Sequence, residues 1–131
     1  DDEYLKSLTE SVDPNMIVSG IGEQPAIIHL KDFGLMGYTS GCVCVAPSKS
    51  MQMLKAIKSG DFARAEDIRS LCTGLEDLRN EYGPIPVLHH AVALSGIADT
   101  GSHLPLLSDL DEVVLQSVAE KSKELLEWEG S

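Results

Sequence analysis

Met16-Ile17-Val18-Ser19-Gly20-Ile21-Gly22-Glu23 decides the fold together with a second stretch, Gly37-Tyr38-Thr39-Ser40-Gly41-Cys42-Val43-Cys44-Val45-Ala46-Pro47. Each stretch joins a short apolar run to small residues, which is typical of a buried parallel strand whose carboxyl end opens into a site. Two such strands, each followed by a helix, make β/α units, and these units bind ligands at the carboxyl ends of their strands. The sequence therefore predicts parallel, adjacent strands over residues 16–19 and 38–45, with a ligand site at their carboxyl ends.

Composition places the chain among globular proteins and excludes several partners. The 131 residues are 43% hydrophobic and 24% charged, which is ordinary for a soluble domain. The excess of 21 acidic over 10 basic residues argues against binding nucleic acid or an anionic membrane surface. No apolar run approaches the roughly 20 residues that a membrane span needs. The odd number of three cysteines fits a reducing compartment, so a cytoplasmic location is expected.

Helix signals fill the rest of the chain. Pro25 and Pro47 are each expected to open a helix, and Asp61 is expected to cap a long one that ends near Tyr82. Ser108, with Asp111 three residues later, resembles the capping box of the last helix. The expected order is helix, strand, helix, strand and four helices, with helices over about residues 3–11, 25–33, 47–59, 61–82, 87–94 and from 108 onward.

Two strands alone do not make a stable sheet. A two-stranded sheet is marginal in water, and a parallel sheet needs both of its faces covered. Either residues outside this chain complete a larger sheet, or the chain associates with itself to complete one. The first possibility is favoured, because the sequence begins within a helical pattern that has no start signal.

Two further motifs follow the strand-end stretches in a recognisable order. They are Lys58-Ser59-Gly60-Asp61-Phe62-Ala63-Arg64-Ala65, and Gly83-Pro84-Ile85-Pro86-Val87 before a helix that ends in Leu94-Ser95-Gly96. In this order and spacing the four motifs resemble the dihydrodipicolinate synthase and N-acetylneuraminate lyase family, the pyruvate-type class I aldolases built on a (β/α)8 barrel. The resemblance implies an α/β fold in which residues 1–60 form the last two β/α units of a TIM barrel and residues 61–131 form a helical extension packed on it.

The resemblance also implies a function. Family members are lyases, aldolases or dehydratases, in which a lysine forms a Schiff base with pyruvate or another 2-oxo acid and the iminium acts as an electron sink. That lysine, on the sixth strand, is expected upstream of this chain, so this segment alone holds no catalytic residue. No cofactor and no metal are expected, and a homo-oligomer, either a tetramer or a dimer, is the expected assembly. The alternative is an inactive homologue that binds a keto acid or a partner.

Four residues match substrate-binding positions of the family. Gly20 and Glu23 match the loop after the seventh strand, and Thr39 and Gly41 match the eighth strand near the keto acid. Gly22 stands where the sialic acid lyases have an aspartate, a departure that argues against that substrate. For Glu23 the alternative is a solvated loop carboxylate, and for Thr39 it is packing of the barrel end.

Cysteines and histidines suggest other sites less strongly. Cys42-Val43-Cys44 is read as packing residues on a strand, because no second pair of ligands follows at zinc spacing. His89 and His90 are adjacent on a helix, so their rings are expected to point about 100° apart. His29 and His103 have no acidic partner at fixed spacing, which makes hydrolytic catalysis improbable.

Overall fold

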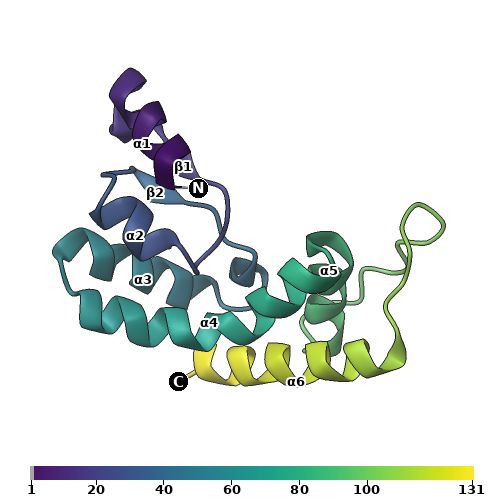
Figure 1. The fold of residues 1–131 in the computed structure, drawn as a ribbon. Coiled ribbons are helices and arrows are strands. Elements are labelled where there is room, and N and C mark those ends of the chain that lie inside the picture. Colours follow the sequence, from purple (N-terminus) through teal and green to yellow (C-terminus); the bar gives the residue numbers. More distant parts are fainter. Residues whose placement is uncertain (1) are drawn as a thin grey trace.

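The structure, a computed structural model, describes residues 2–131, and helices predominate in it (Figure 1). Helix α1 covers Asp2–Ser11, and the 3-10 turn η1 covers Pro14–Met16. The elements that follow, in chain order, are β1 (Val18–Ser19), α2 (Ala26–Lys31), β2 (Gly37–Tyr38), η2 (Cys42–Cys44), α3 (Pro47–Ser59), α4 (Phe62–Tyr82), α5 (Pro84–Leu94) and α6 (Glu112–Glu129). No helix among these residues is long and apolar enough to cross a membrane.

The two strands are parallel and adjacent, as the sequence predicts. Val18 pairs with Gly37 and Ser19 pairs with Tyr38, and α2 lies between the strands in the chain. The second strand is much shorter than residues 38–45, so that part of the prediction is wrong. The backbone leaves the strand after Tyr38 because the hydroxyl of Ser40 accepts a hydrogen bond from the Val43 N–H (2.9 Å) and starts a 3-10 turn. Cys42 and Cys44 therefore lie on this turn rather than on one face of a strand.

Helix ends follow the sequence signals in most places. Gly60 ends α3 with a φ of 80°, a left-handed conformation that glycine adopts readily. The side chain of Asp61 then caps α4 by accepting a hydrogen bond from the Arg64 N–H (3.2 Å). The last helix differs from the prediction, because its N-cap is Asp111 and not Ser108.

Helix α4 connects two hydrophobic cores. Ala65 and Ile68, in its first half, pack with residues of α2 and α3, whereas Cys72 and Leu75, in its second half, pack with residues of α5, α6 and η2. Figure 1 shows α4 running below α2 and α3 and on toward α5, with α6 below it. Leu71, also on α4, is half exposed.

Candidate functional site

A buried carboxylate lies at the carboxyl ends of the strands. Glu23 follows β1 and is fully buried, so it is not a solvated loop residue. Its Oε1 accepts a hydrogen bond from the Ser50 hydroxyl (2.8 Å) and a short one from the Ser40 hydroxyl, and Ser40 comes just after β2. Its Oε2 is shielded from solvent and has no hydrogen-bond partner among the described residues. Glu23 therefore holds the ends of both strands and α3 together, and one of its oxygens is buried without a partner among the described residues.

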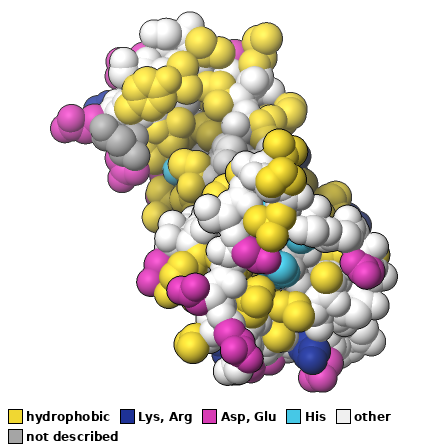
Figure 2. Space-filling view, turned by 90° about the vertical axis from the view of Figure 1, so that its right-hand side faces the viewer, with side chains coloured by type: hydrophobic (Ala, Val, Ile, Leu, Met, Phe, Trp, Pro, Cys, Tyr) yellow, Lys and Arg dark blue, Asp and Glu magenta, His cyan; other side chains and the backbone are white. Residues whose placement is uncertain are grey.

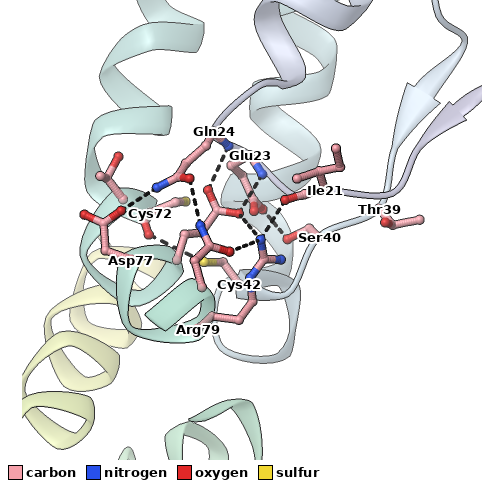
Figure 3. A network of polar contacts seen from close by, with 12 residues as sticks. Ile21, Glu23, Gln24, Thr39, Ser40, Cys42, Cys72, Asp77 and Arg79 are labelled. Carbon is pink, nitrogen blue, oxygen red and sulfur yellow. Dashed lines mark hydrogen bonds and ion pairs between the residues drawn. The ribbon is translucent and has the colours of Figure 1, made fainter. Parts of the chain in front are cut away.

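A second buried carboxylate supports the loop that carries Glu23. Glu76 on α4 accepts hydrogen bonds from the backbone N–H of Glu23 (2.9 Å) and from that of Gln24 (2.7 Å) (Figure 3). Burial, together with the nearby Glu23 carboxylate, raises the pKa of Glu76 to about 7. Glu76 can therefore gain or lose a proton near neutral pH while it holds the loop after β1.

Arg79, also on α4, belongs to the same network. Its guanidinium donates a hydrogen bond to the Ile21 carbonyl (2.7 Å) and lies 3.6 Å from Glu76. Gly22 lies against this pair with a φ of +99°, and a Cβ at this position would overlap the Glu76 carboxylate. Both the backbone conformation and the available space at position 22 therefore favour glycine over a residue with a side chain.

The four predicted substrate-binding residues lie on one side of the strands but differ in exposure. Glu23 is buried and Gly41 is half buried, whereas Gly20 and Thr39 are exposed. The backbone N–H of Thr39 donates to the Ser19 carbonyl (2.7 Å), and its side chain points away from the network around Glu23 (Figure 3). A Cβ on Gly41 would lie 3.0 Å from Leu88 and 3.3 Å from Arg79.

Sequence reasoning missed several residues of this region. Ser50, Glu76 and Arg79 come from α3 and α4, so no local pattern in the sequence connects them to Glu23. His29, which the sequence leaves without a partner, shares a hydrogen bond between its Nδ1 and the Ser19 hydroxyl (2.8 Å). The periodicity of α4 gives the one available signal, since a glutamate at position 76 lies on the same face as Cys72.

Comparison with known protein families shows to which family the chain belongs. The family model described as "Dihydrodipicolinate synthetase family" matches residues 1–124. The chain belongs to the dihydrodipicolinate synthetase family. The resemblance of the strand-end motifs is thereby confirmed at the level of the family, which is a family of lyases. No curated protein sequence matches the chain significantly.

Solved structures of the family share the fold. A dihydrodipicolinate synthase from Oceanobacillus iheyensis is 23% identical with a TM-score of 0.81, covering 100% of this chain and 44% of its own. The enzyme from Bacillus clausii is 25% identical with a TM-score of 0.70, and the match covers 81% of this chain and 36% of that enzyme. A monomeric dihydrodipicolinate synthase variant is 22% identical with a TM-score of 0.77, and the match covers 95% of this chain and 42% of the variant. The chain thus spans less than half the length of these TIM-barrel enzymes.

Proposed function

We propose that the chain is the carboxyl-terminal portion of a Schiff-base-forming lyase, an aldolase or dehydratase, that acts on pyruvate or another 2-oxo acid. In this proposal residues 1–60 supply the last two β/α units of a TIM barrel, and residues 61–131 supply a helical extension. The observation that carries the proposal is the family match over residues 1–124, combined with parallel β1 and β2 whose carboxyl ends share one side.

The nucleophile of the proposed reaction is a lysine upstream of this chain. Every lysine of residues 2–131 lies on a helix, at positions 6, 31, 49, 55, 58, 121 and 123, and none lies at the carboxyl end of β1 or β2. The upstream amine would attack the keto carbon of the 2-oxo acid and release water, and the resulting iminium would accept the electron pair of the bond that breaks. The residues of this chain would then bind and orient the substrate.

Four residues are proposed to contact the substrate: Gly20, Glu23, Thr39 and Gly41. The exposed Gly20 and Thr39 leave backbone accessible at the strand ends, and Gly41 keeps space beside Arg79. The shielded Oε2 of Glu23 has no donor among the described residues, so a substrate hydroxyl is a suitable partner for it. A homo-oligomer also remains a proposal, and the description of one neighbour as a monomeric variant supports it.

Borohydride trapping with pyruvate tests the proposal on the full-length polypeptide that carries these residues. The expected result is a covalent gain in mass equal to one reduced pyruvate adduct, on a lysine outside residues 1–131. Absence of an adduct, with pyruvate or other 2-oxo acids, would reject the lyase and favour the inactive, keto-acid-binding homologue. Pyruvate release and 2-oxo acid dehydration assays then distinguish an aldolase from a dehydratase.

A further inference from the structure

Three histidine rings and one carboxylate meet away from the strand ends, where the chain before α6 folds back onto α5. His89 and His90 lie on α5, and His103 and Asp109 lie in the connection between α5 and α6. The centroids of the three rings are 4.9–5.6 Å apart. Figure 2 faces this end of the molecule and shows histidine side chains at the surface beside acidic ones. The sequence gives no indication of this cluster, because nothing in the residue pattern predicts the path of the connection.

Three of these residues have the geometry of metal ligands. Ring nitrogens of His90 and His103 and a carboxylate oxygen of Asp109 all lie within 4.8 Å of one another. The distance from Asp109 Oδ1 is 2.6 Å to His90 Nε2 and 3.8 Å to His103 Nε2. Two ligands of a tetrahedral Zn²⁺, each about 2.0–2.1 Å from the ion, are about 3.3 Å apart. Small shifts of Asp109, whose side chain is 45% exposed on a loop, would bring both distances to this value.

The ring of His103 has an unused lone pair. Its side chain is only 9% exposed, its Nδ1 is buried without a hydrogen-bond partner among the described residues, and its Nε2 faces the Ser108 carbonyl at 3.1 Å. Ser108 and Asp109 offer oxygen acceptors to Nε2, so without a metal ion Nε2 carries the proton and the lone pair lies on Nδ1, which no donor among the described residues meets. A metal ion bound at Nε2, which lies 3.8 Å from the Asp109 carboxylate oxygen, would replace the Nε2 proton and its hydrogen bond to the Ser108 carbonyl, and the ring proton would then lie on Nδ1.

We propose that His90, His103 and Asp109 bind a divalent transition-metal ion, with Zn²⁺ the best fit, and that the ion fastens the connection before α6 to α5. Two imidazoles and one carboxylate suit zinc, and solvent at the exposed Asp109 side would complete a tetrahedron. His89 lies outside the proposed ligand set, because only His90, His103 and Asp109 bring ligand atoms within 4.8 Å of one another, and its Nε2 shares a hydrogen bond with the Gly101 carbonyl (2.7 Å). The role is structural, because the cluster shares no residue with the network around Glu23.

Calorimetric titration of the chelator-treated, full-length protein with ZnCl₂ tests the proposal. We expect one equivalent of Zn²⁺ to bind and to raise the melting temperature. Asp109→Asn and His103→Gln should each weaken binding at least tenfold, since each removes one of three protein ligands. His89→Gln is the matched control, because it changes a neighbouring ring of the cluster, and it should bind Zn²⁺ like the wild type. His90→Gln provides an independent ligand variant if either of the others folds poorly in the absence of metal.

The spectrum of bound Co²⁺ locates the ion. A second group of possible ligands, Glu23, Cys42 and Cys72, is buried elsewhere in the structure. Histidine and carboxylate ligands give only weak visible bands, whereas thiolate ligands add an intense charge-transfer band in the near ultraviolet. The proposal predicts that this band is absent. Failure of the wild type to bind Zn²⁺, equal affinity in Asp109→Asn and wild type, or a thiolate band that Cys42→Ser removes would each overturn it.

Discussion

The Glu76 carboxylate accepts a hydrogen bond from the backbone N–H of Glu23, with 2.9 Å between Oε1 and the nitrogen, although 53 positions separate the two residues. This bond joins the long helix α4 to the loop after β1, so α4 directly positions a proposed substrate-binding residue. Burial of the Glu76 side chain is complete, and its raised pKa, about 7, follows from that burial. The positioning of the loop is therefore sensitive to protonation near neutral pH.

The first prediction concerns stability against pH. The unfolded Glu76 loses its proton near pH 4.5, whereas the folded residue keeps it until about pH 7. The folded state thus binds more protons between these values, and its free energy of unfolding falls as the pH rises. Glu76→Gln lacks this pH-dependent loss. Its free energy of unfolding relative to that of the wild type should therefore increase by about 3 kcal/mol between pH 4.5 and pH 8. Urea unfolding at several pH values measures the difference.

Glu10→Gln serves as a control for that measurement, because Glu10 lies exposed on α1. Its stability relative to wild type should not follow the same profile. If the difference between Glu76→Gln and wild type were constant across this pH range, the raised pKa of Glu76 would be wrong.

The second prediction compares two glycines of one loop. Gly22→Ala would place a Cβ on the Glu76 carboxylate and force a side chain into a φ of +99°, so we expect a loss of about 2–4 kcal/mol of stability. Gly20→Ala meets no atom within 4 Å and should change stability by less than about 1 kcal/mol. Denaturant midpoints of the two variants provide the comparison, and equal midpoints would show that Glu76 does not lie against Gly22.

How far the sequence predicts this molecule depends on whether the signal is local. Small residues after apolar runs correctly predict that β1 and β2 are parallel, and Gly60 and Asp61 correctly separate α3 from α4. These signals work because backbone conformation and helix capping depend on neighbouring residues. The length of β2 was overestimated, because the Ser40 hydroxyl competes for the backbone and begins a turn.

The parts that the sequence does not predict depend on distant elements. Glu23 looks like an exposed loop residue until Ser50 and Glu76, on α3 and α4, are placed around it. His103 and Asp109 meet His90 only because the connection before α6 returns to α5. Neither arrangement has a sequence period or a fixed spacing, so only the tertiary structure brings these groups together.

The third prediction concerns the carboxyl-terminal end of α6. Glu129 accepts hydrogen bonds from the backbone N–H groups of Ser48 (2.8 Å) and Lys49 (3.1 Å), at the first turn of α3. Burial opposes ionisation of Glu129, but these hydrogen bonds prevail and lower its pKa. A carboxylate is favourable at a helix amino terminus, so Glu129→Gln should lower the free energy of unfolding by about 1 kcal/mol at pH 7.

The same lowered pKa sets the pH dependence of that loss. A carboxyl whose pKa is lowered by folding contributes stability above its unfolded value of 4.5, and this contribution disappears as the pH falls through the folded pKa. The deficit of Glu129→Gln should therefore shrink in acid. Glu127→Gln, an exposed neighbour on α6, is the control in thermal unfolding. A deficit that persists unchanged in acid would contradict the capping role.

The fourth prediction tests the proposed substrate site in the full-length polypeptide. Glu23→Ala should mainly raise KM, because it removes a carboxylate that positions the substrate and the strand ends but leaves the upstream nucleophile in place. A bulky side chain at Gly41 should lower kcat/KM sharply. Its Cβ would already lie 3.0 Å from Leu88 and 3.3 Å from Arg79, so a larger side chain must displace these residues and the turn after β2 that carries the proposed site. Glu10→Gln, on exposed α1, is the control.

The segment alone gives the complementary expectation. A protein made of these 131 residues should show no lyase turnover, because each of its described lysines lies on a helix and none at a strand end. Residues that only position a substrate leave the barrier to carbon–carbon or carbon–oxygen cleavage almost unchanged without a covalent electron sink. Steady-state kinetics on both polypeptides measure this difference. Wild-type kinetics in the Glu23 and Gly41 variants would remove these residues from the site, and turnover by the 131 residues alone would refute the upstream nucleophile.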